Sequence, residues 1–163
     1  QSALTGHLVL STLHTNDAPS AVTRLLDLGV APYLIQSTLL GVLAQRLIRT
    51  LCPHCKEPGE IDDVTWNTLV APWKAPKPKV VQHAVGCLEC HLTGYRGRVG
   101  IYEVLTMTPT LRKIITADYN LDAMREQAQR DGMKAVRISG AMKIAAGITT
   151  PEEIFKIAPP VNC

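Results

Sequence analysis

The stretch GHLVLSTLHTND, residues 6–17, decides the expected fold class. Its apolar run HLVLSTL, residues 7–13, is typical of a strand that is covered on both faces, as in a parallel α/β sheet. A polar turn follows, after which Asp17 is placed to cap a helix with Pro19 in its first turn, and Gly29 should end that helix. The order strand, loop and helix therefore predicts an α/β fold.

The loop after this strand carries the first candidate site. In open α/β sheets, ligands bind outside the carboxyl ends of the strands, so the loop should lie where a phosphate could be sensed. Its polar side chains are Thr12, His14, Thr15 and Asn16. The spacing leaves two roles open for His14, a functional one and a hydrogen bond to a loop carbonyl. For His7, at the start of the strand, a structural role is favoured.

Two further strands are expected, residues 46–51 and 98–105, one on each side of a cysteine-rich segment. A helix from Pro32 to about Ala44 should precede the first of them. The apolar side chains on one face of this helix are Ile35, Leu39, Val42 and Leu43. Between the strands, residues 71–81 are rich in proline and lysine and should form a surface connection.

The last third of the chain has the pattern of helices. Thr108 should cap a helix before Pro109, and helices are expected over residues 121–130 and 134–146. The side chains of the second that should point inward are Ile138, Ala141, Met142 and Ala145. The stretch TPEE, residues 150–153, is a capping box that should begin a last short helix.

Four of the five cysteines form two pairs with the same spacing, CPHC at Cys52 and Cys55 and CLEC at Cys87 and Cys90. Each turn brings two thiolates within reach of one ion, and two turns supply the four sulfurs of a tetrahedral zinc site. Four protein ligands leave no open coordination position for a substrate. The pattern therefore predicts one structural zinc ion that holds together a segment poor in apolar residues.

Other readings of the cysteines are free thiols, a disulfide or a redox pair. A redox role is disfavoured because a catalytic CxxC needs only one pair at a helix N-terminus. His54 and His91 lie inside or beside the two turns, but neither is expected to replace a sulfur. Cys163, at the chain end, is expected to be a loose tail thiol, and the sequence does not assign it a role.

The composition excludes several classes of protein. The chain has 163 residues, is 46% hydrophobic and carries a net charge of +3, which suits a globular domain with an ordinary core. No window approaches the roughly twenty apolar residues of a membrane-spanning helix. Aromatic residues make up only 4% of the chain, and no basic stripe occurs, which disfavours nucleic acid as a partner. The use of cysteine favours a reducing cytoplasm.

Three stretches together closely resemble the secretion ATPase superfamily that powers type II secretion and type IV pilus assembly. They are TGHLVLSTLHTNDAPSAVTRLLDLG (5–29), LLGVLAQRLIRTLCPHCKEP (39–58) and GCLECHLTGYRGRVGIYEVL (86–105). The resemblance covers the whole chain in the right order. It implies the C-terminal part of a RecA-type P-loop ATPase core, with an inserted tetracysteine zinc module and a C-terminal helical subdomain.

The resemblance also implies a division of the chain and roles for the site residues. Residues 1–50 would belong to the ATPase core, 51–97 to the zinc module, and 98–163 to a returning strand and the helical subdomain. In the family, the segment matching residues 6–16 is the His box. The resemblance ties both His14 and His7 to hydrolysis as catalytic residues. His14 would contact or sense the γ-phosphate, directly or through a water, and His7 would hold the strand and loop in register or act from behind His14. The implied nucleotide-binding residues are Thr12, Thr15 and Asn16.

The chain departs from the family pattern in one respect. A phosphate loop of the form GxxxxGK[ST] would be needed to hold the nucleotide, and no Gly-Lys pair occurs in these 163 residues. The acidic Walker B motif and the aspartate box of the family would precede the His box. We therefore expect a piece that begins just after Walker B and does not hydrolyse ATP alone, whereas the full-length parent would bind ATP and magnesium.

The implied partners are those of a motor. The parent would be a homohexamer in the cytoplasm, peripheral at the inner membrane through platform proteins of the secretion or pilus machine. The tetracysteine insertion is characteristic of the export branch rather than of retraction ATPases, and type II secretion is favoured over type IV pilus assembly. Outside the family, the alternative is a zinc-ribbon module that binds nucleic acid.

A set of arginines flanks the cysteine-rich segment: Arg46, Arg49, Arg96 and Arg98. A solvated or ion-paired edge is the favoured interpretation. The alternative is contact with a neighbouring subunit or with acidic patches of a platform protein, for which the forked donors of arginine are suited.

Overall fold

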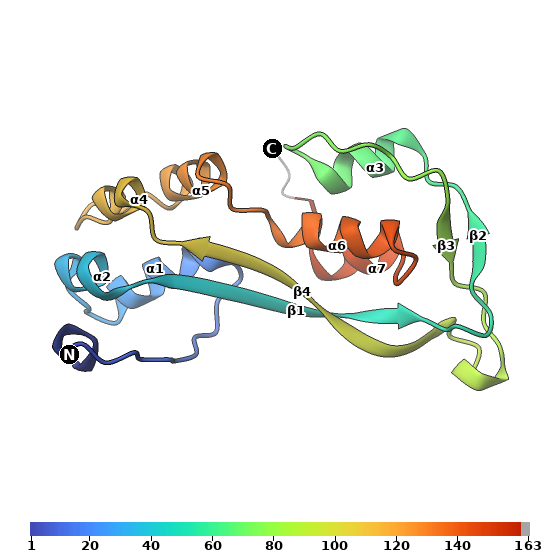
Figure 1. The fold of residues 1–163 in the computed structure, drawn as a ribbon, viewed down its shortest axis with the longest axis horizontal. Helices are drawn as coiled ribbons and strands as arrows, with labels where there is room; N and C mark the ends of the chain where they lie inside the picture. Colours follow the sequence, from blue (N-terminus) through green and yellow to red (C-terminus); the bar gives the residue numbers. More distant parts are fainter. Residues whose placement is uncertain (161–163) are drawn as a thin grey trace. The chain divides into compact units, whose positions relative to one another are not determined.

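The computed structural model describes residues 1–160 and contains both helices and strands (Figure 1). Its elements are the 3-10 turn η1 (Ser2–Thr5), α1 (Ala18–Asp27), α2 (Pro32–Thr38), β1 (Gly41–Leu51), β2 (Glu57–Gly59), α3 (Asp63–Val70), β3 (Val81–His83), the 3-10 turn η2 (Leu88–Cys90), β4 (Tyr95–Thr106), α4 (Pro109–Ile114), α5 (Leu121–Arg130), α6 (Val136–Ala145) and α7 (Pro151–Ile157). The mixed α/β composition is confirmed.

The chain forms two compact units, each assembled from two separate stretches. The first unit comprises residues 1–44 and 103–134, and the second comprises residues 45–102 and the described residues from 135 onward. Helices α4 and α5 thus belong to the first unit, and α6 and α7 to the second. The division into consecutive segments 1–50, 51–97 and 98–163 stays a prediction.

Strands β1 and β4 pair with each other and run in opposite directions (Figure 1). The amide of Cys52 donates to the carbonyl of Gly94 at 2.9 Å, and the amide of Met107 donates to the carbonyl of Leu40 at 3.0 Å. The two strands expected around the cysteine-rich segment are therefore confirmed. A second, shorter antiparallel pair joins β2 to β3, with Pro58 opposite Gln82.

The strand predicted over residues 7–13 is wrong. This segment has no regular secondary structure, and its apolar side chains are exposed, with Leu8 at 75% and Leu10 at 87%. A strand covered on both faces needs hydrogen-bonded neighbours. In the part of the chain that the structure describes, β1 pairs with β4 and β2 with β3, so no strand lies against residues 7–13.

The helix after this segment begins and ends as predicted. Asp17 caps α1, because its Oδ1 accepts a hydrogen bond from the amide of Ser20 at 2.9 Å. Pro19 lies in the first turn, and Gly29 follows the helix with a φ of +82°, a left-handed conformation that glycine adopts at low cost.

The second predicted helix is too long by one and a half turns. Helix α2 ends at Thr38 rather than near Ala44, and β1 begins at Gly41. The guanidinium of Arg112 donates to the carbonyls of Gln36 and Leu39, which satisfies backbone acceptors that a continuing helix would have used. Val42 and Leu43, assigned to the helix face, are instead strand residues.

Each unit has its own apolar core. The largest buried side chains of the first are Val22, Ile35, Leu105, Leu111, Ile115 and Met124. Those of the second are Ile48, Trp66, Leu69, Ile101, Ile144 and Ile154. The second core includes α3, a helix that the sequence analysis did not predict and that Asp62 caps through the amide of Thr65 at 2.8 Å.

The helices of the last third are confirmed in place, with two corrections. Met142 is 64% exposed and Ala145 is also exposed, whereas Ile144 is buried, so the inward face of α6 was partly wrong. Thr150 caps α7 by accepting from the amide of Glu153 at 3.4 Å. The carboxylate of Glu153 bonds to Arg49 instead of closing the expected capping box.

Candidate functional site

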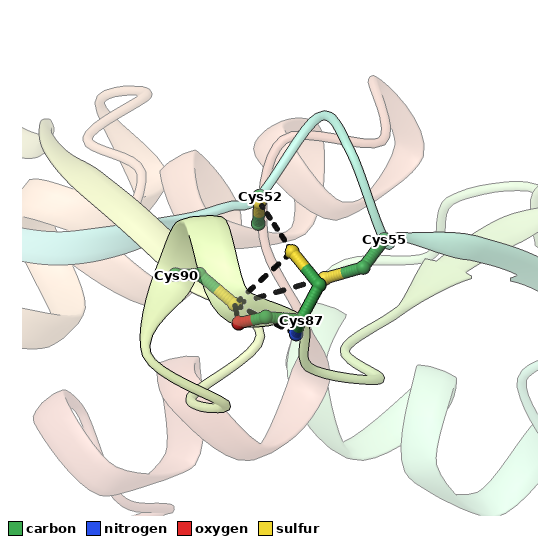
Figure 2. Close-up of side chains that lie close together, drawn as sticks. All are labelled: Cys52, Cys55, Cys87 and Cys90. Atoms are coloured by element: carbon green, nitrogen blue, oxygen red, sulfur yellow. Dashed lines mark hydrogen bonds between the residues drawn. The ribbon is translucent and has the colours of Figure 1, made fainter.

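The four cysteines of the two CxxC turns lie together in the second unit (Figure 2). Cys52 directly follows β1 and Cys90 ends η2, so the paired ends of β1 and β4 bring the two turns face to face. The Sγ atoms are 3.9 Å apart for Cys52 and Cys87, 3.8 Å for Cys55 and Cys90, and 3.8 Å for Cys87 and Cys90. All four lie within 4.8 Å of one another.

This geometry fits a metal ion rather than a disulfide. A tetrahedral site with metal–sulfur distances of about 2.3 Å places neighbouring sulfurs about 3.8 Å apart. A disulfide would need sulfurs about 2.05 Å apart, and all four cysteines are free thiols in the structure. The four side chains therefore form a preformed cluster that could hold a metal ion, which we call the thiol cluster.

Backbone groups support the sulfurs from outside. The amide of Gly86 donates to the Sγ of Cys55 at 3.3 Å, and the amides of Cys87 and Gly94 each donate to the Sγ of Cys90 at 3.2 Å. The carbonyl of Cys87 accepts from the amide of Leu92 at 2.8 Å, which closes the second turn. Amide donors of this kind stabilise thiolates and orient them as metal ligands.

The thiols of the cluster have divergent acidities. Burial raises the pKa of Cys90, but the amides of Cys87 and Gly94 and the neighbouring thiols outweigh it and lower that pKa to about 6. Burial, together with hydrogen bonds among the sulfurs, raises the pKa of Cys55 to about 12. Neighbouring thiolates repel one another, and a bound cation is the kind of group that would stabilise several of them side by side.

The cluster contains cysteines alone among the residues that the structure describes. His54 and His91 are exposed and do not belong to it. Cys163 lies outside the described residues.

An ion pair between the buried carboxylate of Glu153 and the partly exposed guanidinium of Arg49 anchors the end of β1, close in sequence to the thiol cluster. Glu153 of α7 is 4% exposed, and its Oε1 accepts from the amide of Arg49 at 3.0 Å while its Oε2 accepts from the guanidinium at 3.0 and 2.7 Å. The guanidinium lies 4.1 Å from the ring centre of Tyr95, whose hydroxyl is 2.7 Å from the Oγ1 of Thr150. Strands β1 and β4 are thus both tied to the start of α7.

Of the flanking arginines, two show the ion-paired state that the sequence favoured. Arg49 bonds Glu153, and Arg96 lies 3.6 Å from Glu89 at an exposed position. Exposed pairs of the second kind contribute about 0–1 kcal/mol. The guanidinium of Arg49 is already bonded to Glu153 of the same chain, so this residue does not support the alternative that the arginines contact a neighbouring subunit.

The residues of the His-containing loop belong to the first unit, whereas the thiol cluster belongs to the second. His7, Thr12, His14 and Asn16 are exposed, whereas Thr15 is partly buried. The Oγ1 of Thr15 donates to the carbonyl of Asp17 at 3.1 Å, and the Nδ1 of His7 is 3.0 Å from the Oγ1 of Thr5. The structure does not place this loop at a sheet edge, and the roles of its residues stay predictions.

Sequence reasoning missed two charged residues that hold the end of this loop. Glu103 of β4 accepts a hydrogen bond from the amide of Ala18, and Arg125 of α5 donates to the carboxylate of Asp17. A signal for Glu103 was present, because it is the one charged residue within the apolar stretch VGIYEVL of residues 99–105. Arg125 gave no such signal, since charged residues are common on helices.

The first 156 residues of the chain match the protein family described as Type II/IV secretion system protein. The chain is 50% identical over 159 residues to the type IV pilus assembly ATPase TfpB of Acinetobacter baylyi, covering 98% of this chain and 27% of that protein. It is 47% identical over 157 residues to the type II secretion system ATPase E of Vibrio cholerae, covering 96% of this chain and 31% of that protein.

A third relative, the type II secretion system protein E of Pseudomonas aeruginosa, is 46% identical over 157 residues, again 96% of this chain and 31% of the relative. The chain thus spans about a third or less of the length of these relatives. No helix among residues 1–160 is long and apolar enough to cross a membrane. Since the family match extends over nearly all of its length, the chain belongs to the type II/IV secretion system protein family.

Proposed function

We propose that this chain is the C-terminal part of a hexameric, cytoplasmic motor that hydrolyses ATP to drive type II protein secretion. The observation that carries this proposal is the match of residues 1–156 to the family, together with relatives whose names include type II secretion ATPase. The activity belongs to the whole protein, in which ATP and magnesium would bind. Family membership also favours the motor over a zinc-ribbon module that binds nucleic acid.

The thiol cluster would hold one structural zinc ion in this motor. Its sulfurs lie at the separations that a tetrahedral zinc site needs, and all four coordination positions are taken by protein. The ion would supply cohesion between the two turns rather than chemistry. The segment that it holds would present a rigid surface to a neighbouring subunit or to a platform protein at the inner membrane.

Type IV pilus assembly is the second candidate process, because the relative TfpB, named for that process, is 50% identical to this chain. Deletion of the gene that encodes this chain in its host separates the two. We expect loss of proteins released by type II secretion with pili retained. Loss of pili with secretion retained would establish the alternative, and retention of both would overturn the proposal.

The imidazole of His14 would contact or sense the γ-phosphate of ATP, with His7 in a supporting role and with Thr12, Thr15 and Asn16 near the nucleotide. We expect His14→Ala in the full-length protein to lower kcat for ATP hydrolysis by about 100-fold or more, the size of effect seen when one group that stabilises transferred charge is removed. His7→Ala should have a smaller effect.

His54→Ala is the matched control for the His14 prediction, since His54 is an exposed histidine outside the loop. Steady-state phosphate release measures all three variants. An unchanged kcat for His14→Ala would remove His14 from the reaction.

The 163 residues alone should show no ATP hydrolysis above background and no measurable nucleotide affinity. Positioning and charge stabilisation dominate phosphoryl transfer, and the phosphate loop that supplies most of both does not occur in this sequence. Phosphate release and titration with a fluorescent ATP analogue measure these quantities. Steady turnover by the purified 163-residue chain would contradict this expectation.

A further inference from the structure

Three charged side chains hold the point where the His-containing loop joins α1, two by contacting each other and the third by contacting the backbone of Ala18. They are Asp17 at the helix cap, Glu103 on β4 and Arg125 on α5, and all belong to the first unit. We call this group the α1 junction. Residues 12–14 are exposed and have no regular secondary structure, so contacts at the α1 junction set where the end of the loop lies.

Glu103 is the buried member of the junction. It is 6% exposed, and its Oε1 accepts a hydrogen bond from the amide of Ala18 at 2.9 Å. An amide in the first turn has no acceptor within its own helix. Burying a carboxylate costs several kcal/mol unless hydrogen bonds compensate. The buried carboxylate of Glu103 therefore holds the first turn of α1 against β4 through the amide of Ala18.

Asp17 and Arg125 hold the same point from a second side. The Oδ2 of Asp17 accepts from the Nε of Arg125 at 2.9 Å and from its Nη2 at 2.8 Å, while Oδ1 caps the helix through Ser20. The paired donors of a guanidinium fix the direction of a carboxylate as well as its distance. The hydroxyl of Thr15 donates to the carbonyl of Asp17, so that fixing Asp17 also restrains Thr15 within the loop.

We propose that Glu103 and Arg125 are positioning residues for ATP hydrolysis, which act by fixing the orientation of residues 14–16 and hence of the His14 imidazole. This inference rests on the proposed function, because it assigns these residues a task only if His14 acts on the nucleotide. Both reach the loop from elements far along the chain, with sequence separations of 85 residues for Glu103 and Ala18 and 108 for Arg125 and Asp17.

The kinetic test uses the full-length protein with Glu103→Leu, Glu103→Gln and Arg125→Met. Leucine removes the acceptor while nearly preserving volume, and glutamine keeps an oxygen that can accept from the amide of Ala18. Misplacing a catalytic group by about 1 Å can cost about 100-fold, so we expect Glu103→Leu to lower kcat by roughly tenfold to 100-fold. The KM for ATP should change by less than about threefold, since bulk nucleotide binding does not depend on this loop alone.

Glu103→Gln should restore kcat to within about threefold of the unchanged protein, because the hydrogen bond to Ala18 is retained. Arg125→Met should lower kcat less than Glu103→Leu does, as Asp17 still caps α1. The matched control is Glu126→Gln on the same helix as Arg125, because the exposed carboxylate of Glu126 pairs with exposed Arg130 at 3.4 Å. This control should leave kcat unchanged.

A second readout does not depend on catalysis. Hydrogen–deuterium exchange of peptides covering residues 12–20 in the full-length protein should become faster in Glu103→Leu and in Arg125→Met, and not in Glu126→Gln. Thermal unfolding of each variant separates this local loosening from a global loss of stability. If Glu103→Leu does not fold, the results for Arg125→Met test the proposal, because the Arg125 side chain is 39% exposed and can be replaced without opening the core.

The outcomes separate this inference from the proposed function. If His14→Ala slows hydrolysis but Glu103→Leu and Arg125→Met do not, or if exchange over residues 12–20 is unchanged in both, the positioning role is wrong. If His14→Ala leaves kcat unchanged, the proposed role of His14 in hydrolysis is wrong. Faster exchange in Glu103→Leu and Arg125→Met would then show that the α1 junction only stabilises the local structure.

Discussion

Replacing Cys52 by serine is expected to abolish stoichiometric zinc binding and to destabilise the second unit strongly. The Cys52 side chain is fully buried, and its sulfur is one of the four that converge in the thiol cluster (Figure 2). Losing a ligand should weaken zinc affinity by more than the roughly 10- to 100-fold typical of a residue that only orients a ligand. Zinc-to-protein ratios and urea unfolding curves measure the two effects.

The size of the stability loss follows from the coupling of metal binding to folding. Structural zinc contributes about 10–16 kcal/mol in peptides that have no other core. The second unit has an apolar core of its own around Ile48, Trp66 and Ile154, so we expect a loss of several kcal/mol rather than complete unfolding. A strong chelator should reproduce this loss in the unchanged protein.

Cys163→Ser is the matched control, since it removes a thiol that is predicted not to bind the metal. It should keep about one zinc ion per chain, which is the full occupancy of one tetrahedral site. Equal zinc content in Cys52→Ser and Cys163→Ser would show that the thiol cluster is not the metal site.

Removing the carboxylate of Glu153 is the second change for which we expect a large effect. Glu153→Ala would leave the amide of Arg49 without its acceptor and the guanidinium without its partner. Breaking a buried ion pair from one side typically costs about 3–5 kcal/mol. Because the Arg49 side chain is 43% exposed and water can solvate it, we expect a loss near the lower end of that range.

Two comparisons sharpen this prediction. Arg49→Met should be at least as destabilising, because it strands a carboxylate whose side chain is only 3% exposed. Glu152→Gln, at the exposed neighbouring position of α7, should change the free energy of unfolding by less than about 0.5 kcal/mol. Urea unfolding followed by fluorescence measures all three, and similar midpoints for Glu153→Ala and Glu152→Gln would contradict the prediction.

The same ion pair predicts a pH dependence. Hydrogen bonding to Arg49, against the opposing effect of burial, lowers the pKa of Glu153 below its usual 4.5. A carboxyl whose pKa is lower in the folded state stabilises the protein above its unfolded pKa and loses that contribution as the pH falls through the folded value. The stability difference between the unchanged protein and Glu153→Gln should therefore be constant near neutral pH and shrink below about pH 4.5.

Much of the local structure could be predicted from the residue pattern. The caps at Asp17, Thr108 and Thr150 begin helices where expected, and β1 and β4 bracket the cysteines. The convergence of four sulfurs also followed from the spacing of the CxxC turns. These features depend on hydrogen bonds and geometry within a few residues, or on a short motif that is repeated, and such signals survive in a single sequence.

The errors have a common cause in long-range partners. Residues 7–13 have the composition of a covered strand, but a strand forms only where a neighbour offers hydrogen bonds, and composition does not name that neighbour. The early end of α2 depends on Arg112, which is more than seventy positions away. Helix α3 has only eight residues, and its buried side chains Trp66, Leu69 and Val70 contribute to a core built from distant segments.

The α1 junction and the Arg49–Glu153 pair each combine a short-range contact that the sequence predicts with a long-range contact that it does not. The sequence identified Asp17 as a helix cap because the amide that donates to it, that of Ser20, lies only three residues away. Its other partner, Arg125, lies 108 residues away and could not be identified in the same way. Glu153 had the spacing of a capping-box partner, yet its carboxylate bonds Arg49, 104 residues away, where it satisfies two groups instead of one. Short-range chemistry placed the helix starts and the metal ligands. Only the packing of distant segments decided which charges were buried together, because a carboxylate is buried where hydrogen bonds from another part of the chain offset its loss of water.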